Sequence, residues 1–210
     1  MDFEMLMNRC PLIAILRGIT PEEVPQVCDI LYNNGIHLLE VPLNSRDALK
    51  SIESAVRHTA GRMLVGAGTV LTPRDVRDVH AAGGRFIISP NTDVEVVRAT
   101  KLLGMCSIPG FFTASEAFTA IRAGADYLKL FPAILGPNYL KDLRAVIAKP
   151  ILAVGGVNAA NLPEFLKVCA GAGIGSALYK PGKTLEAIQQ SARILKVALA
   201  ENRTGSIHLS

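Results

Sequence analysis

The chain has 210 residues, of which 50% are hydrophobic and 19% charged, and its formal net charge is +4. This composition is too apolar for a disordered chain, and the length suits one large domain or two small ones. The lysines and arginines are scattered singly, which argues against a nucleic-acid-binding surface. No stretch reaches the roughly 18 consecutive apolar residues of a membrane span. We expect a globular protein without nucleic-acid or membrane partners.

The cysteines and the first residues indicate a compartment. Cys10, Cys28, Cys106 and Cys169 are far apart and form no C-x-x-C pair, so we interpret them as reduced, buried thiols rather than as a disulfide framework. The first ten residues, MDFEMLMNRC, carry two acids before a single base, which is not typical of a secretory signal. We therefore expect a cytoplasmic protein.

Eight short apolar runs follow one another, and each precedes a segment with helical signals. Helix starts are indicated at Thr20-Pro21 and Thr72-Pro73, because threonine caps a helix and proline suits its first turn. The runs start about 23 residues apart, a spacing that a compact β-α unit allows. In chain order they are PLIAIL (11–16), HLLEV (37–41), RMLVGAG (62–68), RFIIS (85–89), MCSIPG (105–110), DYLKLF (126–131), ILAVGG (151–156) and GAGIGSAL (171–178).

Alternating strands and helices predict a parallel sheet, and eight such units predict a single compact α/β domain, a (β/α)8 TIM barrel. The alternative is an open doubly wound sheet. That fold would carry a glycine-rich fingerprint after its first strand, and LRGITPEE (16–23) is not one. We expect the barrel to span residues 1–202 and residues 203–210 to form a disordered tail.

A TIM barrel carries its chemistry where its strands end. The predicted strand ends bring together an arginine, a lysine, one acid, small polar groups, an aromatic ring and glycines, an inventory that suits a small polar substrate. These residues are Arg17, Glu40, Asn44, Thr69, Pro90-Asn91, Pro109-Gly110, Lys129, Phe131, Gly155-Gly156 and Ser176.

Lys129 lies in the apolar run DYLKLF and shares a strand face with Tyr127 and Phe131. If that face points into the barrel, burial lowers the lysine pKa, and the neutral amine can attack a carbonyl to form a Schiff base. Alternatively, the lysine only extends to water or to a carboxylate. Glu40 is a candidate proton shuttle for such an imine, or simply an ion-pair partner of Lys129 or Arg17.

The residues also bear on phosphate binding, metal binding and hydrolysis. Gly155, Gly156 and Ser176 follow the last two strands, where barrel enzymes often bind phosphate, although tight turns alone would also explain them. The four histidines show no H-x-x-x-H or H-x-H spacing, so we expect no metal site. A hydrolase is not indicated either, because the chain lacks a G-x-S-x-G elbow.

Motifs along nearly the whole chain, from about Pro11 to Ala200, resemble one family. EVPLNS, GAGTVLTP, SPNT, LKLFPA, GPNYLK, AVGGV and GSALY are similar to the 2-keto-3-deoxy-6-phosphogluconate and -galactonate aldolases, in the same order. The resemblance implies a class I aldolase on a (β/α)8 barrel, commonly a homotrimer, with no metal or organic cofactor. Such an enzyme cleaves a phosphorylated 2-keto sugar acid to pyruvate and glyceraldehyde 3-phosphate.

The resemblance also implies roles for individual residues. The Schiff-base lysine falls on Lys129 and the general acid/base on Glu40. Carboxylate and hydroxyl contacts fall on Arg17, Thr69 and the Pro90 loop, and Phe131 flanks the pyruvyl group. The phosphate contacts fall on the loops that contain Gly155, Gly156, Ser176 and Ala177.

Two positions bear on the substrate. Gluconate-type members carry an arginine four residues after the glutamate, whereas this chain has Asn44, and EVPLNS and GPNYLK are similar to the galactonate type. We therefore predict 2-dehydro-3-deoxy-6-phosphogalactonate as substrate, with the 6-phosphogluconate epimer as the alternative. The galactonate type tends to carry an acid where this chain has Ala177. Two other functions stay open: a phosphosugar isomerase or synthase without an imine, and a non-catalytic phosphosugar-binding barrel.

Overall fold

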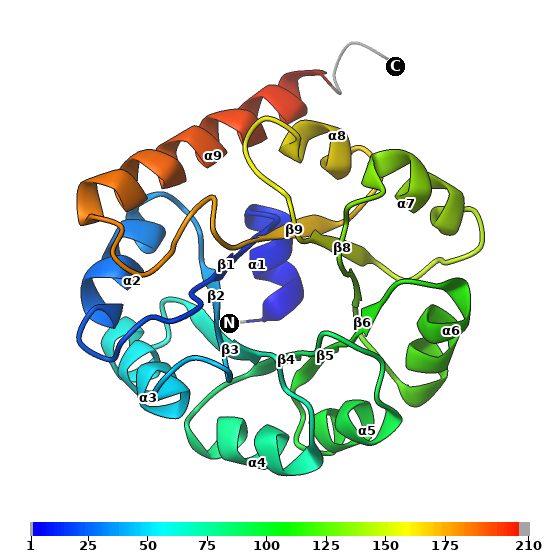
Figure 1. The fold of residues 1–210 in the computed structure, drawn as a ribbon, viewed down its shortest axis with the longest axis horizontal. Coiled ribbons are helices and arrows are strands. Elements are labelled where there is room, and N and C mark those ends of the chain that lie inside the picture. Colours follow the sequence, from blue (N-terminus) through cyan, green and yellow to red (C-terminus); the bar gives the residue numbers. More distant parts are fainter. Residues whose placement is uncertain (1, 206–210) are drawn as a thin grey trace.

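The computed structural model describes residues 2–205, and within them nine parallel strands surround a central axis with helices outside them (Figure 1). Every pairing between neighbouring strands is parallel. The strands are β1 Leu12–Ile15, β2 Leu38–Pro42, β3 Leu64–Gly68, β4 Phe86–Ile88, β5 Cys106–Ile108, β6 Gly110–Phe111, β7 Leu128–Leu130, β8 Ile151–Val154 and β9 Gly171–Ile174.

A short helix precedes the barrel, and one helix follows each strand except β5, which is followed directly by β6. They are α1 Phe3–Arg9, α2 Val24–Asn33, α3 Ala48–Thr59, α4 Pro73–Ala81, α5 Val94–Leu102, α6 Ala114–Ala123, α7 Gly136–Arg144, α8 Leu162–Leu166 and α9 Leu185–Gly205. None of the helices within residues 2–205 combines the length and hydrophobicity that a membrane crossing requires.

The predicted TIM barrel is confirmed, with one difference at the fifth strand. The run MCSIPG supplies two short strands, β5 and β6, on either side of Pro109, which has no N–H to donate to a ladder. β5 pairs with β4 and β6 pairs with β7, so the two ends of the strand order, β5-β4-β3-β2-β1-β9-β8-β7-β6, adjoin each other in the chain. β5 and β6 therefore act as two halves of one barrel strand, and the barrel has eight strand positions around its axis.

The helix starts follow the sequence signals with one shift. Thr72 caps α4 as predicted, since its side chain accepts from the Asp75 N–H and Asp75 reciprocates. After Thr20, residues 21–23 form a turn and α2 begins at Val24 instead of Pro21. At the other end of the chain, α9 runs to Gly205, past the predicted domain end at 202, and residues 206–210 of the predicted tail lie outside the described residues. The predicted domain bounds stay a prediction.

The barrel interior is closed at the N-terminal ends of its strands by α1, which the sequence did not predict. Figure 1 shows α1 lying across the centre of the ring of strands. Its buried side chains Phe3, Leu6 and Met7 pack on one interior cluster with residues such as Phe86. The Phe3 ring meets the rings of Phe86 and Tyr127 edge-on, at centroid distances of 5.2 and 5.0 Å. A second, larger cluster fills the space between the strands and the outer helices. The opposite end of the interior is left for the site.

Candidate active site

Lys129 on β7 and Glu40 on β2 are both buried, with 6% and 2% of their surfaces exposed. Their strands place them among the interior-facing residues, because Tyr127 and Leu38, two residues earlier on the same faces, pack in the interior cluster with α1. The Oε2 atom of Glu40 is buried without a hydrogen-bond partner. A buried acceptor without a partner is costly in a native protein, so this oxygen is available to a substrate or water.

Burial shifts the proton affinities of both groups toward the neutral forms. It raises the pKa of Glu40 to about 7, against the opposing effect of the nearby Lys129 and Arg17 charges. It also lowers the pKa of Lys129, with Glu40 opposing and Arg17 adding to the shift. A lysine with a lowered pKa supplies the neutral amine that a Schiff base needs, and a carboxyl that titrates near neutrality can both give and take a proton.

Neighbouring residues limit the space around Lys129 and Glu40. A Cβ atom at Gly68 would lie 1.9 Å from Glu40 Oε2, so only glycine leaves room for the carboxylate at the end of β3. On the other side, Lys129 Nζ lies 4.4 Å from the centroid of the Phe131 ring. Phe131 is partly exposed, so its ring lies between the lysine and solvent.

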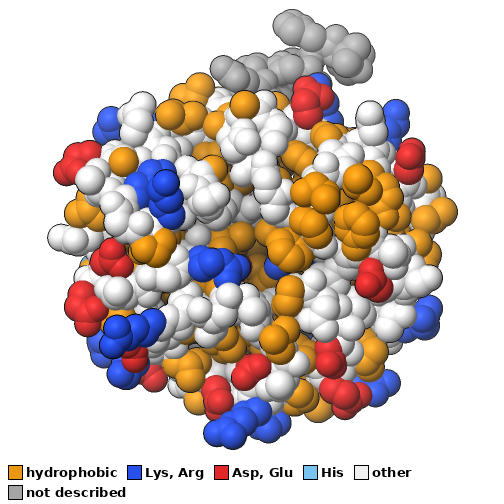
Figure 2. Space-filling model, viewed as in Figure 1, with side chains coloured by type: hydrophobic (Ala, Val, Ile, Leu, Met, Phe, Trp, Pro, Cys, Tyr) orange, Lys and Arg blue, Asp and Glu red, His pale blue; other side chains and the backbone are white. Residues whose placement is uncertain are grey.

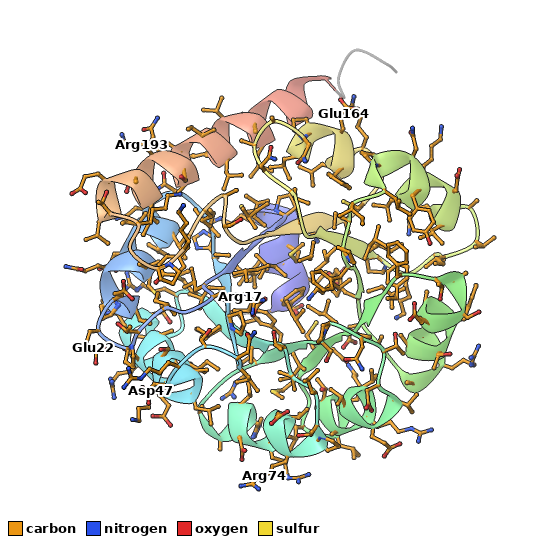
Figure 3. All side chains as sticks on the ribbon, in the orientation of Figure 1. Arg17, Glu22, Asp47, Arg74, Glu164 and Arg193 are labelled. Atoms are coloured by element: carbon orange, nitrogen blue, oxygen red, sulfur yellow. The ribbon has the colours of Figure 1, made fainter. Side chains whose placement is uncertain are left out.

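Arg17 lies at the mouth of the barrel and is hydrogen-bonded to Asn44, the predicted specificity residue. Its Nη1 donates to Asn44 Oδ1, while the Gly18 N–H donates to Ser45 Oγ at 2.8 Å, so the loops after β1 and β2 are held together. Figure 3 shows Arg17 near the centre of the ring, whereas the other labelled charged residues lie at its rim. In the same view, Figure 2 shows a hollow at the centre of this face.

Thr69 and Pro90 follow β3 and β4 at the same end of the barrel. Thr69 adopts a left-handed backbone with φ of 55°, which is uncommon for a β-branched residue and is concentrated at functional sites. The Pro90 backbone packs against Gly110, where a Cβ atom would approach to 2.4 Å. Neither residue makes a hydrogen bond to Lys129 or Glu40 within the described residues. Their predicted substrate contacts stay a prediction.

The predicted phosphate residues line one cavity of about 720 Å3 that opens at the ends of β1, β7, β8 and β9. Gly155 and Gly156 have φ values of 97° and 79°, a backbone that glycine adopts without strain. Within the described part of the chain, the N–H groups of Gly155, Gly156, Ser176 and Ala177 donate to no acceptor. Such a concentration of unpaired N–H groups is typical of an anion-binding site.

The sequence analysis missed several residues that line this cavity. Tyr179, Lys180 and Pro181 belong to the same loop as Ser176, a few residues further on. Lys180 places a second cation beside Arg17 at the cavity wall. The sequence prediction covered only residues close to the end of the last strand. Lys180 lies further along the loop that follows this strand, and its place in that loop was the signal that could have indicated it.

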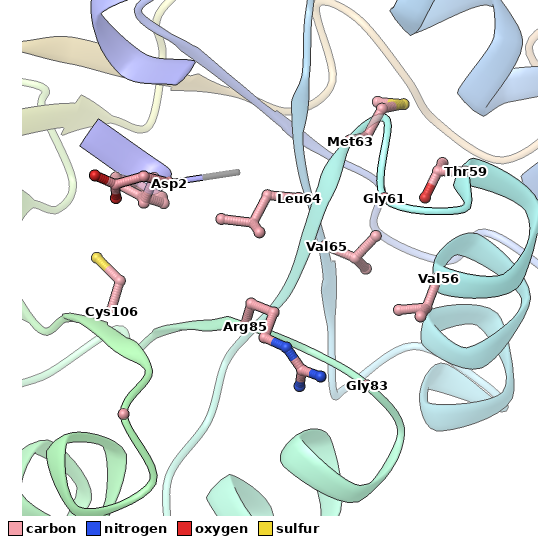
Figure 4. A pocket seen from close by; sticks show the side chains of 12 residues that line it. Asp2, Val56, Thr59, Gly61, Met63, Leu64, Val65, Gly83, Arg85 and Cys106 are labelled. Carbon is pink, nitrogen blue, oxygen red and sulfur yellow. The ribbon is translucent and has the colours of Figure 1, made fainter. Parts of the chain in front are cut away.

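A second cavity, of about 440 Å3, lies at the opposite end of the barrel beside α1 and contains none of the predicted site residues. Asp2, Arg85 and Cys106 are among its lining residues, and Figure 4 shows the Arg85 guanidinium directed away from Asp2. Its charged groups therefore do not converge on one point. Residues 2–205 also contain no group of three or more His, Cys, Asp or Glu side chains placed to hold a metal ion.

The sequence profile of the family described as "KDPG and KHG aldolase" matches residues 3–197, almost the whole chain. This chain belongs to the KDPG and KHG aldolase family. The resemblance predicted from the motifs is thereby confirmed. In this chain the barrel carries Lys129, Glu40 and the cavity lined by Gly155 and Ser176 at the same end.

Three relatives show how the chain lies within the family. The 2-dehydro-3-deoxy-6-phosphogalactonate aldolase of Escherichia coli strain K12 is 44% identical over 194 residues, which cover 90% of this chain and 95% of the relative. A solved structure described as "Native KDPGal structure" is 42% identical with a TM-score of 0.91, covering 93% of this chain and 97% of its own.

The third relative bears on the chemistry. The KDPG aldolase of Legionella pneumophila, solved with pyruvate captured at low pH as a covalent carbinolamine intermediate, is 30% identical with a TM-score of 0.82. The match covers 95% of this chain and 98% of that one. A galactonate-type relative is thus more similar in sequence than this gluconate-type one.

Proposed function

We propose that this protein is a class I aldolase that reversibly cleaves 2-dehydro-3-deoxy-6-phosphogalactonate to pyruvate and D-glyceraldehyde 3-phosphate. The observation that carries the proposal is the buried pair of Lys129 and Glu40, whose pKa values are shifted toward the neutral amine and the neutral acid. The adjoining cavity with its unpaired N–H groups supports a phosphorylated substrate. Covalent capture of pyruvate by a 30% identical relative supports the Schiff-base route.

The reaction begins with binding at two anionic groups. Arg17 and Thr69 hold the carboxylate and a hydroxyl, and the loops that contain Gly155 and Ser176 hold the phosphate. The neutral amine of Lys129 adds to the C2 ketone and forms a carbinolamine. Glu40 then gives its proton to the departing hydroxyl, which leaves as water, and a protonated imine remains on Lys129.

The imine then serves as the electron acceptor for carbon–carbon cleavage. Glu40, now a carboxylate, accepts the proton of the C4 hydroxyl while the C3–C4 bond breaks and its electrons move to the imine. Glyceraldehyde 3-phosphate departs and an enamine remains. The enamine carbon takes the proton back from Glu40, and water adds to the imine to release pyruvate and free Lys129. Phe131 limits the access of bulk water to the imine from one side.

The choice of epimer rests on the loop after β2. The two candidate substrates differ at the C4 hydroxyl, the group that must lose its proton. Asn44 lies four residues after Glu40 and accepts a hydrogen bond from Arg17, so it orders the region that C4 would occupy. The 44% identity to a galactonate-type enzyme, against 30% for the Legionella gluconate-type enzyme, also supports the galactonate epimer.

We also propose that three copies of the chain associate in a reducing cytoplasm. Large apolar side chains are exposed beside the site on the segment after β7, with Ile134 at 72% and Leu135 at 53% exposure, and Figure 2 shows an apolar area on this face. A partner copy would cover such a surface. Cys10, Cys28, Cys106 and Cys169 form no disulfide bond, which supports a reducing compartment. Light scattering would measure the mass, and Ile134→Glu should reduce it.

The test of the proposed function is a cleavage assay with both epimers, in which released pyruvate is coupled to lactate dehydrogenase. We expect kcat/KM for the galactonate epimer to equal or exceed that for the gluconate epimer. A strong preference for gluconate would overturn the substrate assignment and leave the aldolase chemistry intact. Absence of pyruvate release from both epimers would instead favour the isomerase or the binding barrel.

A further inference from the structure

The loop between β9 and α9 forms one helical turn at the edge of the anion-binding cavity. The N–H groups of Leu178 and Tyr179 both donate to the Gly175 carbonyl, at 2.8 and 2.9 Å. The two preceding N–H groups, of Ser176 and Ala177, have no acceptor among the described residues, and both residues line the cavity. The residues that carry these two free N–H groups thus lie at the start of the turn, in the wall of the cavity.

The other end of this turn would leave its carbonyl groups without partners, as any helical turn does. Lys183 provides these partners, because its Nζ donates to the carbonyl oxygens of Ala177 and Leu178 at 3.2 and 2.9 Å. The same Nζ lies 2.7 Å from Ser191 Oγ on α9. One ammonium group thus ties the C-terminal end of the turn to the helix that follows it.

Each of the three hydrogens of the Lys183 ammonium group has an acceptor. The Ser191 hydroxyl donates to the Ala187 carbonyl at 2.9 Å, so toward Lys183 its oxygen acts as an acceptor. Three acceptors then face the three hydrogens of Nζ. Lys183 is half-buried, and it is not among the residues that line the cavity. Its hydrogens are directed to the Ala177 and Leu178 carbonyl groups and to Ser191, so any influence on the cavity passes through the turn.

We propose that Lys183 is a positioning residue for phosphate binding: it fixes the turn that contains Ser176 so that the free N–H groups of Ser176 and Ala177 converge on the substrate phosphate. The proposal rests on the proposed function, because it assigns the anion in this cavity to the substrate. Its effect is confined to the phosphate end of the substrate. The Schiff-base chemistry at Lys129 depends on other strands.

The test compares Lys183→Met, which keeps the aliphatic length and removes all three donors, with Lys183→Arg, which keeps the charge and several donors. We expect Lys183→Met to raise KM for the phosphorylated substrate, and the inhibition constant of inorganic phosphate, by about tenfold, the worth of roughly one hydrogen bond to a charged group, with kcat little changed. Lys183→Arg should restore most of the loss. Ser191→Ala removes one of the three acceptors and should give a smaller rise.

The matched control is Lys196→Met, the same substitution at an exposed lysine on α9, the helix that follows Lys183, which should leave KM unchanged. Trapping of pyruvate on Lys129 by borohydride does not involve phosphate, so it should proceed equally in wild type, Lys183→Met and Lys196→Met.

Each other outcome has one meaning. An unchanged KM and unchanged phosphate inhibition in Lys183→Met, with normal trapping, would overturn the positioning role. Parallel loss of trapping and cleavage in Lys183→Met would show a general structural role and would also overturn it. Absence of trapping in the wild type would refute the proposed function itself, whatever Lys183 does.

Discussion

The two ends of this barrel are built from the same strands, yet they hold opposite kinds of side chain. On β2, Leu38 packs at the N-terminal end, and two residues later Glu40 is buried at the C-terminal end. Beside β7, Tyr127 meets the ring of Phe3, and two residues later Lys129 is buried near Glu40. A step of two residues along one strand face changes an apolar contact into an ionisable group.

The difference shows where the molecule gains stability and where it keeps reactivity. At the N-terminal end, α1 covers the interior and its side chains make close apolar contacts. At the C-terminal end, Glu40 Oε2 and the N–H groups around Gly155 and Ser176 have no partners within the described chain. The unpaired, buried oxygen of Glu40 costs stability, and the apolar packing under α1 offsets this cost.

The largest expected effect comes from removing the amine at the open end. Lys129→Ala should reduce cleavage to less than about a few per cent of the wild-type rate, because it removes the buried amine assigned to the imine. The fold should survive, because removal of a buried ionisable group also removes the cost of burying it. The coupled pyruvate assay and a thermal melt measure the two properties. Retention of substantial activity would contradict the assignment of Lys129 as the Schiff-base lysine.

The next largest effect is expected at Glu40. Glu40→Gln keeps the shape of the side chain but cannot transfer a proton, so kcat should fall by roughly 10²–10⁴-fold. A defect confined to KM would mean that Glu40 only binds substrate.

The same residue sets the pH dependence. In the active state the Glu40–Lys129 pair carries one proton, and Glu40 titrates with a pKa of about 7. As the pH falls below that value the pair takes up a second proton, the amine is no longer free, and kcat/KM should fall. A pH–rate profile that stayed flat below neutrality would contradict this assignment.

At the closed end, the expected effect is on stability and not on catalysis. Leu6 is 2% exposed on α1, and Leu6→Ala should lower the free energy of unfolding by about 2–5 kcal/mol with kcat little changed. Met5→Ala on the same helix, where Met5 is 53% exposed, is the matched control and should change little. Equal effects of the two substitutions would show that α1 does not seal the barrel.

The smallest expected effect concerns the choice of epimer. Asn44→Arg replaces the acceptor of the Arg17 hydrogen bond with a longer cation that competes for Glu40. The ratio of kcat/KM values should shift toward the gluconate substrate by roughly 1–3 kcal/mol. Asn44→Ala separates the loss of the amide from the gain of the arginine. An unchanged ratio in both variants would place epimer selection elsewhere.

Much of the fold was predictable because its signals are local. Apolar runs, the Thr72 cap and the spacing of the units each depend on a few neighbouring residues, and together they predicted the barrel. The role of α1 was not predictable, because Phe3 and Leu6 gain their meaning from Phe86 and Tyr127 far along the chain. The break at Pro109 was also missed, since it depends on which neighbour each half-strand pairs with.

The residues of the site also fall into those with a local sequence signal and those without one. Lys129 and Glu40 were predictable because an ionisable residue in an apolar strand is conspicuous by itself. Lys183 was not, because its function depends on the carbonyl groups of Ala177 and Leu178, and backbone partners leave no mark in a sequence. The free N–H groups of the cavity were likewise visible only once the turns were placed in space.

The central claim is that the buried lysine of the open end is the nucleophile. The most direct test is incubation of the protein with pyruvate and borohydride, followed by peptide mapping by mass spectrometry, with Lys129→Ala as the blank. The account predicts one reduced pyruvyl adduct, on Lys129, that is absent from the variant. No adduct, or an adduct on another lysine that persists in Lys129→Ala, would contradict it.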